Sequence, residues 1–446
     1  MAHPFRQTFS RLVKTDVFTT LTGSGVSAAV RLVTFALLAR WLSRETFGEW
    51  VLFQTYYTLF DTVRTGFQSA FVNHASGTDE ATFRRYAGAA WQLSLVLTLA
   101  ANALLGGVVL GAGWLGWAAG ETHLLGWFFA LSLISLPNSL SDWTLYARRQ
   151  FRFLQSLKLG VQTLFLLAIA GAWFSENLTV PVLYGAFVGA NALVAALTFV
   201  TGWNRLGSFG AGTATERRQL WQFGRYSTGT LLSANLLRSS DTLLLGALLG
   251  PAAVVVYHVP QRVVELLEMP IRSTVVASVP RLAALYGQGP EAMAAWFQKT
   301  AGRLWVVLLP FSVGCFVLAE PLVVWLGGAG YRESAGLLRI FMVYTAFLPL
   351  ERYGGIGLDA VRRPHLNLTK VAVMLVVNVA GDLVALLGFH SVTGVALASI
   401  GTFLTGLGLG YFWLGKHIPV TLWGTLRGGL KEARHWVQKS SYAGIR

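Results

Sequence analysis

The stretch GSGVSAAVRLVTFALLARWLSRETFGEWVLFQTYYTLFD, from Gly23 to Asp61, contains two apolar runs separated by a short polar turn. An α-helix needs roughly 20 such residues to cross the ~30 Å hydrocarbon core of a bilayer. Similar runs recur along all 446 residues, of which 54% are hydrophobic and 12% charged. Because the bilayer interior offers no partner for free backbone polar groups, these runs are expected to be helices. The sequence therefore predicts an all-α membrane protein that crosses the bilayer many times.

Hydropathy and the positions of Pro and Gly predict about twelve transmembrane helices. Six are expected near residues 17–40, 47–73, 86–112, 123–146, 153–174 and 180–203, and six more near residues 222–249, 253–279, 297–319, 335–358, 368–388 and 391–414. The most polar, Gly-rich stretch between the two sets is Asn204 to Gln219. We therefore expect an N-terminal six-helix lobe over residues 17–203, a linker over residues 204–219 and a C-terminal six-helix lobe over residues 220–414.

Basic residues collect in every second loop of this arrangement. The positive-inside rule places those loops, and with them both termini, in the cytoplasm. The rule also accounts for the net charge of +15, so nucleic acid is not an expected partner. Residues 1–16 and 415–446 mix basic and apolar positions at helical spacing. Both segments are predicted to be amphipathic helices that lie on the cytoplasmic membrane surface.

A faint internal repeat relates the two predicted lobes, and chance pairing of apolar helix positions is the alternative explanation. An offset of 207 residues places Arg31 on Arg238 and Gln54 on Gln261, and also Asp61 on Glu268, without a gap. The match is imperfect, since Arg64 falls on Ile271. An even number of spans in each lobe gives both lobes the same orientation, so the pattern favours a duplication whose halves are related by an axis along the membrane normal.

Four predicted spans carry ionisable residues at steps of three and four, which places them along one face of each helix. A charge at the bilayer centre costs about 2.5–3.5 kcal/mol on insertion scales, so each needs a partner, a cavity or a function. We expect these faces to line a cleft between the lobes, with Arg31, Arg64, Arg238, Arg262 and Arg272 as anion ligands and Gln54, Asp61, Asp241, Gln261, Glu265 and Glu268 as cavity or ion-coupling groups. The alternative is that neighbouring charges form ion pairs within a helix and only hold helices together.

The chemistry of these groups suggests what the cleft binds. Planar guanidinium groups bind phosphate or pyrophosphate through two hydrogen bonds, and buried carboxylates can accept a proton or sodium. No cofactor and no structural metal are expected, beyond a coupling H+ or Na+. Four further charged residues lie near span ends, where snorkelling or capping is an equal explanation: Asp142, Glu351, Arg352 and Asp382.

The first span pair resembles the start of the bacterial polysaccharide transporters, the Wzx-type O-antigen flippases of the multidrug/oligosaccharidyl-lipid/polysaccharide exporter superfamily. These begin with a Gly/Ser-rich helix that carries an Arg, followed by an L-S-x-x-x-F-G turn, here Leu42 to Gly48. The segment with the turn Gly250 to Tyr257 and with Pro280 resembles their seventh and eighth helices. The resemblance implies two six-helix bundles in a V around a central cavity that opens to each side in turn.

The resemblance implies a flippase that moves an undecaprenyl-pyrophosphate-linked oligosaccharide from the cytoplasmic to the periplasmic leaflet of a bacterial inner membrane. Its expected partners are that lipid-linked substrate, membrane lipids and polysaccharide assembly proteins, and the protein itself is expected to be a monomer and not an enzyme. Two alternatives stay open: a cation-coupled drug antiporter of the same superfamily, and a membrane glycosyltransferase or ligase. The antiporter predicts a cavity dominated by acids, and the transferase predicts a long extracytoplasmic loop.

Overall fold

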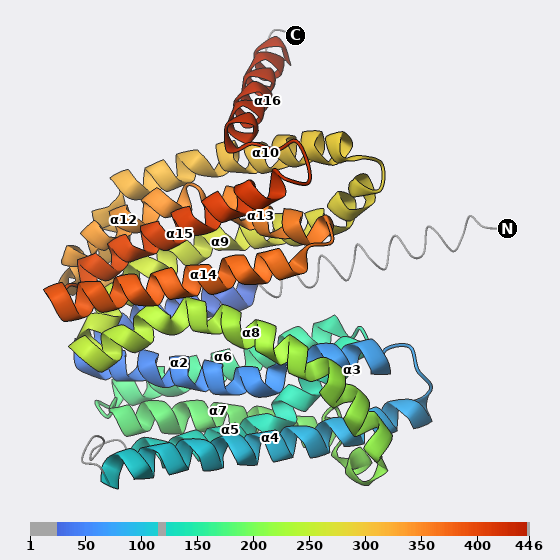
Figure 1. Cartoon of the computed structure of the whole chain (residues 1–446). Coiled ribbons are helices and arrows are strands. Elements are labelled where there is room, and N and C mark those ends of the chain that lie inside the picture. Colours follow the sequence, from blue (N-terminus) through green and yellow to red (C-terminus); the bar gives the residue numbers. More distant parts are fainter. Residues whose placement is uncertain (1–24, 115–121, 444–446) are drawn as a thin grey trace. The chain divides into compact units, whose positions relative to one another are not determined.

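The computed structural model of the protein describes residues 25–114 and 122–443, so the predicted surface helix at residues 1–16 lies outside the described residues. Helices follow one another along nearly all of this part of the chain, and it contains no strand (Figure 1). Residues 25–41 are helical and are followed by α2 (Arg44–Thr65), α3 (Gln68–Ala75), α4 (Glu80–Trp114), α5 (Thr122–Ala147), α6 (Phe151–Phe174), α7 (Val180–Thr201) and the short 3-10 helix η1 (Leu206–Ala211).

The second half of the chain begins with two helices of 36 residues each. Its elements are α8 (Ala214–Leu249), α9 (Pro251–Tyr286), α10 (Pro290–Val317), α11 (Ala319–Gly327), η2 (Ala329–Ser334), α12 (Ala335–Thr345), α13 (Leu348–Ala360), α14 (Pro364–Leu383), η3 (Val384–Gly388), α15 (Val392–Leu414) and α16 (Leu422–Ala443).

The predicted all-α membrane fold is confirmed. Among the described residues, six helices are long and apolar enough to cross a membrane, with a seventh if η2–α12 and α13 count as one span: α4, α6, α7, α10, α14 with η3, and α15. The helices with charged faces, α2, α8 and α9, are not among them, and each carries several ionisable residues.

Two predicted spans are broken. The span expected at residues 47–73 ends as α2 and restarts as α3 after Gly66 and Phe67. A Cβ at Gly66 would lie 2.1 Å from the Thr228 hydroxyl oxygen, so this break brings α8 very close. The span expected at residues 335–358 is bent by 42° between α12 and α13. Pro349 stands in the first turn of α13, where the missing N–H costs nothing, and it favours a new helix start there.

The chain divides into two compact units. The first contains residues up to Leu42 and Glu49–Asn235, and the second contains Ser43–Gly48 and Leu236–Arg446. The division therefore falls inside α8, while the stretch proposed as a linker, residues 204–219, is itself structured as η1 and the start of α8. Each unit has its own buried aromatic core, with Phe71, Phe83 and Trp143 in the first and Phe297, Tyr353 and Tyr411 in the second.

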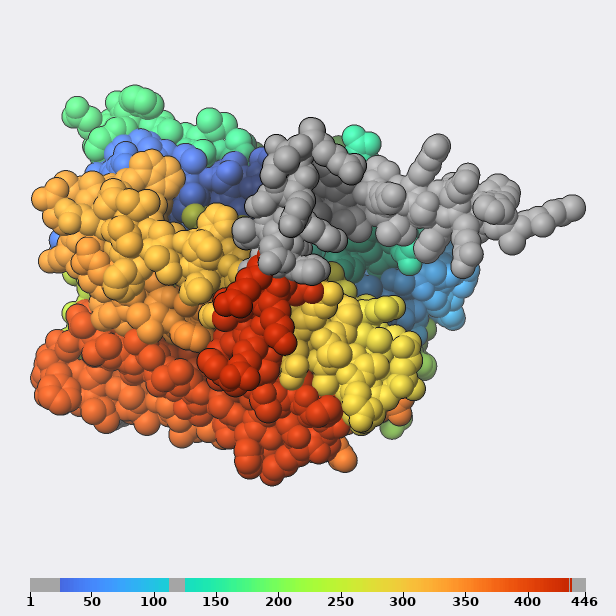
Figure 2. Space-filling view, turned by 90° about the horizontal axis from the view of Figure 1, so that it is seen from above, coloured from blue at the N-terminus to red at the C-terminus, as the bar shows by residue number. Residues whose placement is uncertain are grey.

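In both units, the segment that follows the last long helix packs back against an earlier helix. After α7, η1 packs back on α4, and after α15, α16 packs back on α10; Figure 2 shows α16 in red against the yellow residues of α10. Each return depends on a glycine pair. A Cβ at Gly88 would lie 2.5 Å from the Gly212 nitrogen, and one at Gly302 would lie 2.7 Å from the Gly429 nitrogen.

Candidate functional site

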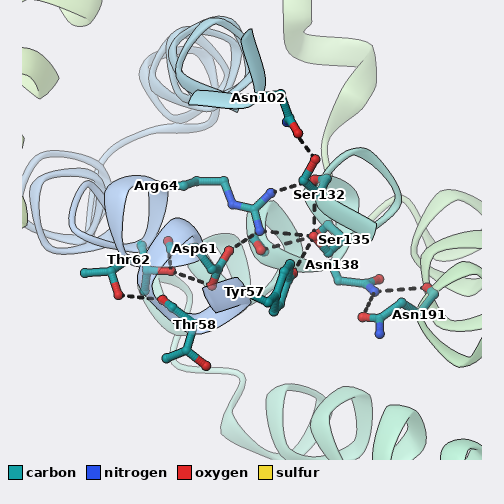
Figure 3. Close-up of polar contacts among 12 residues, drawn as sticks. Tyr57, Thr58, Asp61, Thr62, Arg64, Asn102, Ser132, Ser135, Asn138 and Asn191 are labelled. Carbon is teal, nitrogen blue, oxygen red and sulfur yellow. Dashed lines mark hydrogen bonds and ion pairs between the residues drawn. The ribbon is translucent and has the colours of Figure 1, made fainter. Parts of the chain in front are cut away.

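Arg64 of α2 is enclosed by the helices of the first unit (Figure 3). It pairs with Asp61 one turn earlier. Its Nη1 donates to the Ser132 carbonyl at 3.2 Å, and its Nη2 donates to the Ser135 hydroxyl at 3.2 Å. The side chain is only 4% exposed. Arg64 and Asp61 are thus neutralised inside the unit, as the ion-pair alternative supposes for this pair.

Neutral side chains extend the Arg64 network. Tyr57 donates to the Ser135 hydroxyl at 2.7 Å, and Asn102 of α4 donates to the Ser132 hydroxyl at 2.8 Å. From α8, Asn235 donates to the Thr62 hydroxyl at 2.7 Å. Hydroxyl and amide groups therefore complete this cluster (Figure 3), and they add no charge to it.

Arg31 and Gln54 lie outside this closed network. Arg31 is exposed on the helix formed by residues 25–41. When the Gln162 amide is oriented to satisfy both of its atoms, its oxygen accepts from Arg31 Nη1 at 2.9 Å. Gln54 is half-buried on α2. Of the predicted residues in the first unit, Asp61 and Arg64 are brought together, while Arg31 remains accessible.

In the second unit, several predicted residues of α9 lie close to Arg352 of α13, which was not predicted to be an anion ligand. Glu268 pairs with Arg272 and, at 3.4 Å, with Arg352 of α13. Arg262 pairs with Glu265 at 2.7 Å. The exposed Arg238 of α8 interacts electrostatically with this group, which we call the arginine cluster: Arg238, Arg262, Arg272, Arg352, Glu265 and Glu268. Its four guanidinium groups face two carboxylates, so it keeps a surplus of positive charge.

A buried ion pair continues the arginine cluster into the core. Glu351 lies 3.7 Å from Arg352 and accepts a hydrogen bond from Lys370 of α14 at 2.6 Å. The Lys370 and Glu351 side chains are 2% and 5% exposed. Snorkelling at a span end is therefore wrong for Glu351, because its carboxylate is enclosed by protein, whereas its place in the first turn of α13 fits the capping alternative.

A second acidic group lies deep between α8, α9, α14 and α15. We call it the carboxylate pair, Asp241 and Asp382, because the amide nitrogen of Asn378 donates to both. Tyr257 and Ser399 also donate to Asp241. Asp382 is fully buried, and its Oδ1 has no hydrogen-bond partner among the described residues. Two carboxylates that share one amide repel each other unless a proton or a cation lies between them.

The sequence missed several of these groups for different reasons. Asp382 was considered a residue near a span end, but its burial rules out snorkelling. Asn378 and Lys370 were not considered, although both lie on the predicted span 368–388 and at spacings that place them on one face with Asp382. Asp142, also assigned to a span end, lies 3.7 Å from Lys158. Gln261 is half-buried beside Arg262, with a buried side-chain oxygen that has no hydrogen-bond partner in the described part of the chain.

Three solved structures share this fold. The lipid II flippase MurJ in an inward closed conformation gives a TM-score of 0.73 at 12% identity, covering 92% of this chain and 90% of that one. An inward-facing multidrug resistance MATE family transporter gives 0.70 at 14%, covering 91% and 96%. A MOP superfamily transporter from Pyrococcus furiosus gives 0.57 at 14%, covering 90% and 94%. At such identities the likeness concerns the fold alone.

The sequence itself supplies the family. No curated protein sequence matches the chain. The family described as "Polysaccharide biosynthesis protein" matches residues 37–336, which is more than half of the chain and includes the helices that carry Arg64, the arginine cluster up to Arg272, and Asp241. The chain is therefore a multi-pass membrane protein with a transporter fold, and it belongs to the polysaccharide biosynthesis protein family.

Proposed function

We propose that this protein is a flippase that moves an undecaprenyl-pyrophosphate-linked oligosaccharide from the cytoplasmic to the periplasmic leaflet of a bacterial inner membrane, for polysaccharide or O-antigen biosynthesis. The observation that supports this most is the surplus of guanidinium groups in the arginine cluster. Charged residues within membrane-spanning helices are costly, and an unneutralised surplus is retained where it binds something of opposite charge.

The geometry of the arginine cluster suits a pyrophosphate. Arg238 and Arg272 are exposed, while Glu268 is held between Arg272 and Arg352. An arriving phosphate can accept hydrogen bonds from the free edges of these guanidiniums, which bind phosphate oxygens in pairs. Arg31 of the first unit is accessible for the same role, whereas the enclosed Arg64 positions α2 against α5.

The carboxylate pair is the proposed site of ion coupling. Its buried, unpartnered oxygen on Asp382 offers a ligand to a proton or a sodium ion, and Asp241, Ser399 and Asn378 supply further oxygens. Ion binding would remove the repulsion between the two carboxylates and so stabilise the packing of α8 against α14. The proposal therefore assigns coupling to the second unit, at residues other than Asp61 and Glu268, which are both paired with arginines.

A reconstituted flipping assay tests the proposal. The full-length protein is placed in liposomes with the lipid-linked glycan extracted from cells in which the gene is disrupted, and the glycan that reaches the opposite leaflet is measured by enzymatic labelling. We expect Arg238→Gln with Arg272→Gln to reduce the rate by about 100-fold, since two phosphate ligands are lost.

The matched control is Arg332→Gln, which removes an exposed arginine of the same unit that pairs with Glu320 outside the arginine cluster. It should flip at the wild-type rate. Wild-type transport by the double variant would overturn the anion-binding role. If the protein exports an organic cation, and the Arg238→Gln and Arg272→Gln substitutions leave that export unchanged, the drug antiporter is supported instead.

A further inference from the structure

The first unit contains an open concavity that the arginine cluster and the carboxylate pair do not use. It lies between α3 and the first half of α8 and has a volume of about 870 Å³. Typical small-molecule pockets measure about 300–1,000 Å³, so two or three sugar rings would fit. Its lining includes Ser69, His74, Gln222, Phe223, Tyr226 and Thr230.

The lining is aromatic and polar, and Arg225 lies against its edge: Nη2 of Arg225 donates to the Tyr226 hydroxyl at 2.9 Å, and its guanidinium lies 4.7 Å from the centroid of the Tyr226 ring. No Asp, Glu, Lys or Arg is among the described residues that line it. Tyr226 is 67% exposed, and the Phe223 ring is also accessible. The Gln and hydroxyl side chains donate and accept hydrogen bonds, as sugar hydroxyls require, and aromatic faces pack against the apolar face of a sugar ring.

Close packing holds the walls of the concavity in place. A Cβ at Gly224 would lie 2.1 Å from the Phe67 ring, so α8 is pressed against the break between α2 and α3. Tyr86 donates to the Gln219 side-chain oxygen at 2.6 Å, and His74 Nδ1 donates to the Ala70 carbonyl at 2.8 Å. The carbonyl can only accept, so the hydrogen lies on His74 Nδ1. In the neutral ring, Nε2 is then an acceptor that a ligand can use.

The concavity lies at the end of the first unit from which the proposed substrate would enter, the cytoplasmic end. It lies at the end of the unit where α3 finishes at Ala75, α4 starts at Glu80 and α8 starts at Ala214. The same end carries Arg148, Arg205 and Arg217 in its loops and helix ends. The positive-inside rule assigns such an end to the cytoplasm, the side on which the glycan of the proposed substrate faces water before transport.

We propose that this concavity binds neutral sugar residues of the lipid-linked substrate, with Tyr226 and Phe223 as stacking platforms and Gln222 and Thr230 as hydrogen-bonding groups. This rests on the proposed function and adds to it a separate glycan subsite, distinct from the guanidinium groups that hold the pyrophosphate. A lipid-facing aromatic belt is the competing explanation, but it would not require a row of amides and hydroxyls beside the rings.

Equilibrium binding to the full-length protein in lipid nanodiscs tests the subsite with two probes. One is the lipid-linked glycan extracted from cells in which the gene is disrupted, and the other is undecaprenyl pyrophosphate without sugar. We expect the wild type to bind the glycan-bearing lipid more tightly. Tyr226→Ala, and separately Gln222→Leu, should weaken only that binding, by about tenfold, and leave the Kd of the bare lipid unchanged.

The matched control is Tyr146→Ala, an exposed tyrosine of α5 in the same unit that does not line the concavity. It should leave both Kd values unchanged. Equal affinity of the wild type for both probes, or equal weakening of both by Tyr226→Ala, would overturn the glycan subsite and leave the flippase standing. Failure of the wild type to bind either probe would overturn the proposed function as well.

Discussion

The charged faces of the two units look alike in sequence but differ in how their charges are neutralised. In the first unit, Asp61 and Arg64 satisfy each other and are completed by hydroxyl groups. In the second, Glu268 is shared by Arg272 and Arg352, and Asp241 shares the Asn378 amide with Asp382. The first network is closed and neutral, whereas the second leaves guanidinium and carboxylate groups able to bind ions.

This difference teaches that a matched position need not have a matched role. The offset of 207 residues aligns Asp61 with Glu268, but their partners come from different places. Arg64 lies three residues from Asp61, while Arg352 lies 84 residues from Glu268. The two proposals accordingly assign glycan binding to the first unit, and pyrophosphate binding and ion coupling to the second.

The largest contrast is expected from removing one cation in each unit. Lys370→Met removes the cation that neutralises the enclosed Glu351 carboxylate, and it should lower the free energy of unfolding by about 3–5 kcal/mol. Arg64→Met should cost about 1–3 kcal/mol, because Asp61 is 29% exposed and keeps the Thr65 hydroxyl as a donor. Unfolding of the purified protein by SDS in mixed micelles measures both values. Adding Glu351→Gln to Lys370→Met should restore most of the loss, and equal costs in the two units would remove the contrast.

The second largest difference between the units is expected in how strongly an ion gradient stimulates flipping. Asp382→Asn should reduce the stimulation of flipping by an imposed proton or sodium gradient at least about tenfold, because the carboxylate pair can no longer release and rebind the ion. Asp61→Asn in the first unit should retain the stimulation. The liposome assay, run with each gradient separately, measures both. Gradient dependence that survives in the Asp382 variant would place coupling elsewhere.

Substitutions in the two glycine pairs are expected to lower stability equally, because both units pack a returning segment against a helix in the same way. Gly88→Ala and Gly302→Ala each push a Cβ into backbone atoms 2.2–2.3 Å away, so each should lower stability by about 1–3 kcal/mol. Gly106→Ala on α4 and Gly314→Ala on α10 meet nothing within 4 Å and serve as controls. Thermal unfolding followed by tryptophan fluorescence compares the four. A cost in only one unit would show that the two returns are not equivalent.

The smallest effect concerns the docking of α16. Hydrogen bonds from Lys299 and Arg303 lower the pKa of Glu432. A carboxylate with a lowered folded-state pKa stabilises the docked form above its unfolded pKa, and this contribution disappears as pH falls through the folded value. Amide hydrogen exchange over residues 422–434 should therefore be slow at neutral pH and accelerate below about pH 4.3. Glu432→Gln should exchange faster at neutral pH and lose this dependence.

Much of the fold followed from local patterns. Apolar runs of bilayer length predicted where most helices lie, but not the breaks after Thr65 and before Leu348, the start of α8 at Ala214 or the short helix α11. Those breaks depend on the close approach of α8 and on a proline in a first turn, and neither changes hydropathy. Spacing at three and four residues also identified Asp61 with Arg64 and Arg262 with Glu265 as neighbours, because helix geometry makes them so.

The sequence by itself determined that this protein spans a membrane many times and that ionisable residues lie within its helices, since composition and helical period are local properties. Only the tertiary structure decided which charges are neutralised and which remain available. Asn378 contacts Asp241 across 137 residues, and Arg352 reaches Glu268 across 84. Such partners are set by how helices pack, and the electrostatic energy of a buried group depends on those partners more than on its own identity.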